Sequence, residues 1–278
     1  TGSLAPADKR LYALRDVTAT VPSIPLIVAS IMSKKLAEGI DSLVLDVKFG
    51  SGAFMKTQEE ARKLALAMID VGHEMGKSVS ALLTDMNQPL GKSAGNSLEV
   101  IESVEMLRGE GPSDLVEITM ELAVAMLLLG KVESDSVQAR ARLDSAISSG
   151  AALKRFERMV ELQGGSVAAL RDYRKLPTAQ IQHSVIADRA GFVTKVDAEG
   201  IGRGCIVLGA GRLKTDDKVD FAVGISELCK VGDRVDKGSK LLTIHANDRS
   251  RLEEAQKLIG AAVIIEENKK TSESLIVE

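Results

Sequence analysis

Two short apolar runs rich in β-branched residues flank one amphipathic stretch, and this alternation constrains the fold more than any other feature of the sequence. The runs are residues 42–48 (SLVLDVK) and 78–84 (SVSALLT), and residues 58–75 between them have a helical pattern of apolar positions. A strand, a helix and a second strand at this spacing form a βαβ unit with a right-handed crossover. The sequence therefore predicts an α/β fold with a parallel sheet.

The segments on either side of this unit differ from each other in pattern. Residues 4–37 predict two helices joined by a proline-containing turn, and residues 113–173 predict helices that cover one face of the sheet. From residue 178 onward, glycines separate short strand candidates, and a helix over residues 248–263 is expected to close the chain. The strand candidates are residues 183–188, 191–197, 205–211, 220–227 and 240–246.

Composition excludes several classes of protein. The chain has 278 residues, enough for a sizeable core, and its net charge of −3 with no tryptophan gives no electrostatic or stacking case for nucleic acid. No apolar run approaches the roughly 20 residues of a membrane span, so we expect no membrane contact. The two cysteines, Cys205 and Cys229, lack CxxC spacing, which favours free buried thiols in a reducing, cytoplasmic compartment.

One arginine, one serine and one lysine stand on the two N-terminal helical segments. Ser30 and Lys34 are four residues apart, so they share a helix face, and Arg15 lies at the end of the preceding segment. These donors suit a planar ligand edged with carbonyl oxygens. An amphipathic helix with a solvated polar face explains the same pattern.

The first strand ends in a glycine-containing turn, FGSGAF, at residues 49–54. Glycines at the carboxyl end of a strand allow a ligand to approach the backbone, and they also form plain tight turns. Asp46 and Lys48 alternate with apolar residues of the same strand. They either face the crevice at the strand end or form a structural ion pair.

Residues 12–39, YALRDVTATVPSIPLIVASIMSKKLAEG, closely resemble the pyrimidine-nucleoside phosphorylases, which include the thymidine phosphorylases. The likeness continues through LVLDVKFGSGAFMKT at 43–57 and LLTDMNQPLGKSAGNSLEV at 82–100, and it extends into the C-terminal part. Because similar proteins carry a sequence like residues 1–9 in their interior, we expect this chain to be the C-terminal portion of a longer protein.

The resemblance implies three parts of the fold. Residues 1–37 are expected to belong to a small helical domain that binds the base and carries the contact of a homodimer. Residues 38–176 are expected to form an α/β domain with a parallel or mixed sheet, and residues 177–278 a β-rich, barrel-sandwich-like domain. The segment 231–246 is similar to the turn of biotinyl and lipoyl-carrier barrels, but its hairpin lacks the lysine that such carriers modify.

The resemblance also implies an activity, the phosphorolysis of pyrimidine nucleosides such as uridine, thymidine and deoxyuridine. Inorganic phosphate is the co-substrate, the products are the free base and a pentose 1-phosphate, and no organic cofactor is expected. Arg15, Ser30 and Lys34 are implied to bind the pyrimidine base, and removing one charged donor should cost about 2–4 kcal/mol in the transition state. The apolar walls of the implied pocket are Val21, Ile27 and Phe54.

A cation site is expected in the polar loop after the second strand. Its Asn and Gln side chains and free carbonyls, followed by Glu102, could coordinate a hard cation. The resemblance implies a potassium ion held by the main-chain carbonyls of Leu90 and Ser93 and by the Glu102 carboxylate. The other ligands of the family site lie upstream of this sequence.

The family's phosphate-binding loop also lies upstream of residue 1. We therefore expect this chain to supply the base-binding half of the site and to be inactive alone. A thymidine-specific enzyme and an archaeal-type nucleotide phosphorylase are the alternatives within the family. A non-catalytic base-binding or scaffold fragment and a carrier domain are the alternatives from other classes.

Overall fold

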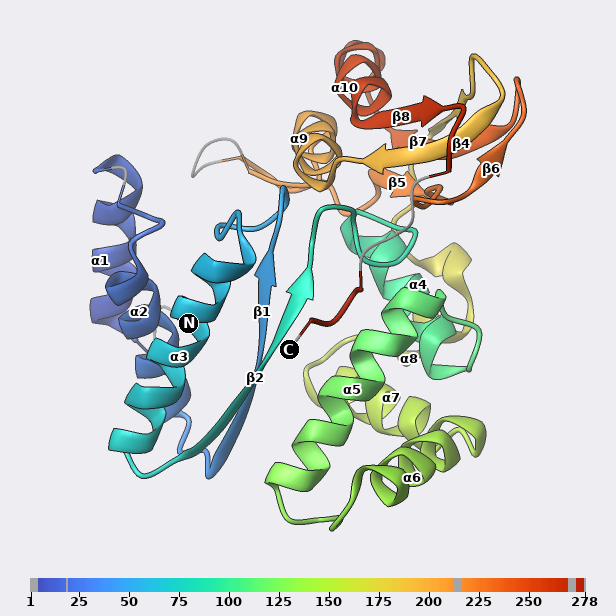
Figure 1. Ribbon diagram of the computed structural model, residues 1–278. Coiled ribbons are helices and arrows are strands. Elements are labelled where there is room, and N and C mark those ends of the chain that lie inside the picture. Colours follow the sequence, from blue (N-terminus) through green and yellow to red (C-terminus); the bar gives the residue numbers. More distant parts are fainter. Residues whose placement is uncertain (1–4, 19, 213–216, 270–273, 278) are drawn as a thin grey trace. The chain divides into compact units, whose positions relative to one another are not determined.

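The computed structural model describes residues 5–18, 20–212, 217–269 and 274–277 (Figure 1). It confirms the α/β class, with helices, a small parallel sheet and two antiparallel sheets. The chain divides into two compact units. The first unit comprises Thr1–Asp85, Ile118–Leu143 and Leu275–Glu278, and the second comprises Met86–Glu117 and Asp144–Ser274. The division into residues 1–37, 38–176 and 177–278 stays a prediction.

Two helices open the first unit, as expected for residues 4–37. Helix α1 spans Pro6–Val17 and helix α2 spans Ile24–Ala37, and each has a proline in its first two positions. Proline fits there because its missing N–H would have no intrahelical partner. Ser23 occupies the N-cap position of α2, but its side chain makes no capping hydrogen bond.

The predicted βαβ unit is present. Strands β1 (Ser42–Phe49) and β2 (Ser78–Asp85) pair in parallel, with Ser42 opposite Ser78 and Phe49 opposite Asp85, and helix α3 (Gln58–Glu74) connects them (Figure 1). The helix begins at a capping box in which Glu60 N donates to Thr57 Oγ1 and Thr57 N donates to the Glu60 carboxylate. These bonds satisfy two backbone donors that a helix start would otherwise leave free.

Apolar side chains of α2, α3 and the two strands form the core of the first unit. Its buried members are Ile27, Val28, Met32, Val47, Phe49, Met55, Ala61, Leu64, Ala65, Met68 and Leu83. A close contact between helix and sheet requires glycine at one point, because a Cβ on Gly72 would lie 2.2 Å from Val79 Cγ2. The apolar residues thus repeat about every 3.6 positions in the helices and every 2 positions in the strands, and these periods predict which faces are buried.

The end of the chain adds to the parallel pair. Asp85 N donates to Leu275 O at 2.9 Å and Val277 N donates to Leu83 O at 3.0 Å, which forms an antiparallel bridge between Thr84 and Ile276. The sheet is therefore mixed. This short partner segment lies nearly two hundred positions away along the chain, so the sequence near β2 carries no signal for it.

Residues 113–173 are helical, as predicted. The helices between β2 and β3 are α4 (Asn96–Leu107), α5 (Ser113–Leu129), α6 (Ser136–Ser148), α7 (Ala151–Leu162), α8 (Val167–Arg171) and the 3₁₀ turn η1 (Tyr173–Lys175). Across the described residues, no helix combines the length and the apolar character that crossing a bilayer requires.

The β-rich part of the second unit contains two three-stranded antiparallel sheets, of order β3-β7-β5 and β6-β4-β8. The strands are β3 (Ile181–Ile186), β4 (Gly191–Val196), β5 (Gly224–Ser226), β6 (Arg234–Val235), β7 (Lys240–Ala246) and β8 (Val263–Glu266). Helix α10 (Arg249–Ala262) begins after the N-cap residue Asp248, whose Oδ1 accepts from Arg251 N at 2.9 Å. The predicted helix is confirmed, but β8 follows it.

One strand prediction is wrong. Residues 205–211 were expected to form a strand, whereas residues Ala198–Leu208 form helix α9, which packs beside α10 (Figure 1). Ile201, Cys205 and Leu208 recur at helical spacing and are buried, so the apolar run is one face of a helix. A Cβ on Gly204 would lie 2.5 Å from Ile259 Cγ1, so this glycine permits close helix packing.

Candidate functional site

Arg15 lies in the last turn of α1 and is only 5% exposed. Its Nη1 donates to Leu26 O at 3.2 Å and its Nη2 donates to Val21 O at 2.5 Å. Its Cζ lies 5.1 Å from the centre of the Tyr12 ring. Nε is buried and has no hydrogen-bond partner among the described residues. The guanidinium therefore joins the end of α1 to the start of α2, and its buried Nε donor stays unused.

Ser30 and Lys34 meet on α2, as their spacing predicts, and Asp8 of α1 joins them. Lys34 Nζ donates to Ser30 Oγ at 3.0 Å and to Asp8 Oδ2 at 2.8 Å. Hydrogen bonds from Lys34 and Ser30, together with the charges of Lys34 and Arg15, hold the pKa of Asp8 below its usual range against the opposing effect of burial. Asp8 is thus an ionised partner that keeps the Lys34 ammonium in place.

The three predicted wall residues have different surroundings. Ile27 is buried in the core of the first unit, and Val21 is half-buried and offers its carbonyl to Arg15. Phe54 is 64% exposed, just past the end of β1. Its aromatic ring is therefore the member of this set with the most surface left to contact a ligand.

The glycine-containing turn that carries Phe54 closes on itself. Gly50 N donates to Met55 O at 3.0 Å, and Ala53 N donates to Gly50 O at 3.1 Å. Gly50 has a φ of +114°, a conformation that a side chain would strain. The tight-turn interpretation of these glycines is sufficient to explain the local backbone.

Asp46 and Lys48 form an ion pair, the structural alternative of the two considered. Lys48 Nζ lies 2.7 Å from Asp46 Oδ2, and the fully buried Thr84 donates its hydroxyl to Asp46 Oδ1 at 2.5 Å. Both members of the pair lie on β1, and Thr84 of β2 links them to the neighbouring strand near the carboxyl ends, since Lys48 Nζ also donates to Thr84 Oγ1 at 3.1 Å.

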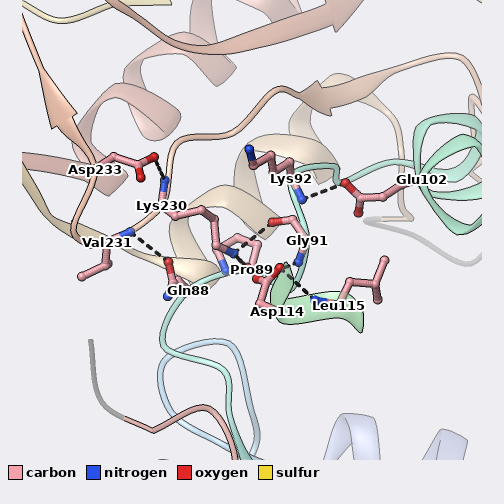
Figure 2. Close-up of polar contacts among 10 residues, drawn as sticks. All are labelled: Gln88, Pro89, Gly91, Lys92, Glu102, Asp114, Leu115, Lys230, Val231 and Asp233. Carbon is pink, nitrogen blue, oxygen red and sulfur yellow. Dashed lines mark hydrogen bonds and ion pairs between the residues drawn. The ribbon is translucent and has the colours of Figure 1, made fainter. Parts of the chain in front are cut away.

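A second cluster lies in the second unit, where Lys230 reaches the loop after β2 (Figure 2). Its Nζ lies 2.6 Å from Asp114 Oδ2 and donates to Pro89 O at 2.5 Å and to Gly91 O at 3.0 Å. Asp114 also accepts from Gly91 N at 3.1 Å. Three oxygen atoms from two segments thus surround one ammonium group.

Glu102 of α4 lies beside the same loop. Its Oε1 accepts from Lys92 N at 2.8 Å (Figure 2). Burial raises the pKa of Glu102, and hydrogen bonds from Lys92 N–H and the Ser93 hydroxyl oppose that effect only in part. Gly91 has a φ of +69°, and a Cβ there would lie 2.1 Å from Glu102 Oε2. The glycine therefore leaves the space that the carboxylate fills.

The carbonyl groups of residues 89–94 divide into three pairs. Lys230 takes the first pair, as described above. Backbone N–H groups take the second pair, because Leu228 N donates to Lys92 O at 3.0 Å and Ile225 N donates to Ala94 O at 2.7 Å. The backbone of this loop is consequently held along its length by residues of the β-rich part.

The third pair comprises the carbonyls of Leu90 and Ser93, which accept no hydrogen bond from the described residues. Backbone carbonyls in folded proteins nearly always find a partner, which is a protein donor, water or an ion. These two carbonyls and the Glu102 carboxylate are the oxygen ligands that a hard cation prefers, so they fit the potassium ion implied by the resemblance. Within the described part of the chain, no group of three or more His, Cys, Asp or Glu could hold a metal, so an ion here would depend on backbone oxygens.

Sequence reasoning missed three residues of these clusters: Asp8, Asp114 and Lys230. An acidic residue in the first turn of α1 was a signal for Asp8, but nothing in the pattern pairs it with Lys34. Lys230 comes from a turn 139 positions after Gly91, and its partnership with this loop has no local signal.

The first part of the chain, residues 1–153, matches the family described as "Glycosyl transferase family, a/b domain". This match covers more than half of the sequence, and the chain belongs to this glycosyl transferase family. Residues 192–266 match the pyrimidine nucleoside phosphorylase C-terminal domain. The two matches together confirm the resemblance on which the site predictions rest.

Curated relatives agree with these matches. The pyrimidine-nucleoside phosphorylases of Staphylococcus aureus strains USA300 and NCTC 8325 / PS 47 are each 48% identical to this chain over 265 residues. The protein of the same name from strain bovine RF122/ET3-1 is 47% identical over the same length. The alignments cover 95% of this chain and 61% of each relative.

Proposed function

We propose that this chain takes part in the phosphorolysis of pyrimidine nucleosides, namely uridine, thymidine and deoxyuridine, in cytoplasmic pyrimidine salvage. Inorganic phosphate is the co-substrate, and the products are the free base and a (deoxy)ribose 1-phosphate. The Lys34 ammonium, held between Ser30 and an ionised Asp8, is the observation that carries this proposal. The names of the relatives support the reaction class.

In this reaction a phosphate oxygen forms a bond to C1′ while the bond from C1′ to the base nitrogen breaks. The bonding electron pair leaves with the base, whose negative charge spreads over its carbonyl oxygens and ring nitrogen. A cationic donor aimed at those atoms lowers the barrier. An ammonium group has three N–H donors, and Lys34 spends two of them on Asp8 and Ser30, so one donor remains for the base.

Arg15 and Ser30 complete the proposed base site. The unused Nε donor of Arg15 is buried at the junction of α1 and α2, where a ligand carbonyl would satisfy it. Its two bonds to backbone carbonyls hold the guanidinium in one orientation. The apolar groups assigned to the wall are Val21, Ile27 and Phe54, of which Phe54 is the most exposed.

A potassium ion is proposed at the carbonyls of Leu90 and Ser93 and the carboxylate of Glu102. The lack of any described donor to the two carbonyls supports this assignment. The burial that raises the pKa of Glu102 also means that this carboxylate gains from a cation partner. A bound potassium ion would supply positive charge that fixes the loop, with no role in bond making.

Two further features support the proposed setting. The α1–α2 segment exposes large apolar side chains, which favours the homodimer implied by the resemblance. These side chains are Leu11, Tyr12, Leu14 and Leu26. Both cysteines are free and buried, and burial raises the pKa of the Cys205 thiol to about 12 and that of Cys229 to about 11, as suits a reducing compartment.

The test is the release of uracil from uridine and of thymine from thymidine, with and without phosphate. The chain is assayed alone and joined to the part of a Staphylococcus aureus relative that it does not cover. Phosphate-dependent release supports the proposal, and the ratio of the two rates separates broad from thymidine-specific activity. Base binding without release by either protein would instead favour a non-catalytic binding role. The absence of both binding and release would refute the proposal.

A further inference from the structure

We propose that Lys230 is a positioning residue for the cation site: its ammonium is a tethered cation that holds the carbonyls of Pro89 and Gly91, so that those of Leu90 and Ser93 remain for a mobile ion. This inference rests on the potassium site proposed above. It adds a second cation position to the loop, one that the protein itself permanently fills.

The surroundings of the Lys230 ammonium resemble those of a bound ion. Its three partners are two backbone carbonyls and one carboxylate, and its side chain is 16% exposed. Two of its N–H groups donate to the carbonyls, and the Asp114 carboxylate pairs with its charge. The proposed ligands of the mobile ion are likewise two carbonyls and one carboxylate, taken from the same loop and from α4.

The turn that carries Lys230 is fixed against the loop. Lys230 N donates to Asp233 Oδ2 at 2.8 Å, and Val231 N donates to the Gln88 side-chain oxygen at 3.1 Å (Figure 2). The ammonium is therefore held from its own backbone as well as from its tip. A lysine held at both ends is preorganised, so the loop does not lose further freedom when an ion binds.

Charge supports the same division. Lys230 Nζ lies 2.6 Å from Asp114 Oδ2, and the Glu102 carboxylate lies beside the same loop, where it accepts from Lys92 N at 2.8 Å. Two carboxylates and one ammonium sum to a single negative charge. Lys230 thereby leaves a net charge that one monovalent cation neutralises.

The experiment measures potassium affinity by titration calorimetry of the chain joined to the part of a Staphylococcus aureus relative that it does not cover, because the remaining ligands of the implied site are expected in that part. Choline chloride holds the ionic strength constant. Lys230→Met should weaken potassium binding by about 10–100-fold, the range typical for residues that orient metal ligands. Lys240→Met is the matched control, since Lys240 lies in the same β-rich part and pairs only with Glu227 in the described structure. The control should bind potassium like the wild type.

Asp114→Asn provides a second variant that keeps the side-chain shape and removes the charge that anchors Lys230. It should also weaken potassium binding, and it tests the role of Lys230 if the Lys230→Met protein does not fold. Potassium affinity within twofold of wild type in a folded Lys230→Met or Asp114→Asn protein would overturn only the role of Lys230 and would leave the cation site standing. A joined protein of otherwise wild-type sequence without measurable potassium binding would overturn the cation site and, with it, this inference.

Discussion

Two clusters in this chain surround a lysine ammonium with oxygen atoms, and they differ in how many donors remain. On α1 and α2, Lys34 donates to Asp8 and Ser30, and its third N–H has no partner among the described residues. In the second unit, Lys230 donates to two carbonyls and pairs with the Asp114 carboxylate, so its three contacts are all within the protein. The first lysine is suited to meet a ligand, and the second is suited to hold a loop whose other oxygens meet one.

The comparison shows how the same side chain is given a binding or a structural role. A single carboxylate and a hydroxyl orient Lys34 and leave it one free N–H, whereas Lys230 contacts a carboxylate and two backbone carbonyls. The groups without a protein partner are of opposite kinds in the two clusters. In the first they are hydrogen-bond donors, which suit an electron-rich base, and in the second they are carbonyl acceptors, which suit a cation.

The largest expected effect comes from Lys34→Met in the chain joined to the remainder of a relative. The variant should lose about 10²–10³-fold in kcat/KM for uridine, because it removes a charged donor to the leaving base. Steady-state phosphorolysis measures this loss. Lys35→Met is the control, since Lys35 pairs with Glu38 on the exposed side of the same helix. Equal losses in both variants would remove Lys34 from the base site.

An intermediate effect is expected from Gly91→Ala in the loop. Gly91 and Gly76 both have φ near +70°, but only at Gly91 would a Cβ meet another group, Glu102 Oε2 at 2.1 Å, while nothing lies within 4 Å of Gly76. Gly76→Ala should lower the free energy of unfolding by about 1 kcal/mol through backbone strain alone. Gly91→Ala should lower it more and should also weaken potassium binding. Urea unfolding of both variants checks the difference, and equal effects would argue against a packed Glu102 carboxylate.

The smallest effect concerns the pH dependence of the Asp8–Lys34 pair. The pKa of Asp8 is lowered in the folded chain from 3.8, so the pair stabilises the fold at pH values above 3.8. That contribution is lost as the pH falls from 3.8 through the lower folded-state pKa. Asp8→Asn should therefore be less stable than the wild type at pH 6, and the difference in unfolding free energy should shrink in acid. A difference that stays constant from pH 6 to pH 2.5 would contradict the pair.

The first cluster could largely be predicted from the sequence, and the second could not. Ser30 and Lys34 meet because a helix places residues four apart on one face, and the apolar period of the segment predicts that helix. Lys230 meets Gly91 only through the fold of the whole second unit, so no periodicity reveals it. The family resemblance indicated Glu102 as a cation ligand, but it did not indicate Lys230.

The fold shows the same distinction. Repeats of apolar residues predict β1, α3 and β2, whereas β6 and β8 are short and are held by pairing with β4. The segment 205–211 was assigned to a strand because a continuous apolar run is compatible with both strand and buried helix. The close packing of Gly204 against Ile259 of α10 favours the helical conformation of this segment. Because the two residues are far apart in the sequence, a local pattern cannot reveal that contact.

The most direct test of the account is titration calorimetry of uracil into the wild-type chain and into Lys34→Met. The account predicts measurable binding by the wild type and at least tenfold weaker binding by the variant, because the loss of one charged donor costs more than 1.4 kcal/mol. Equal uracil affinity in the two proteins would show that the α1–α2 cluster does not recognise the base.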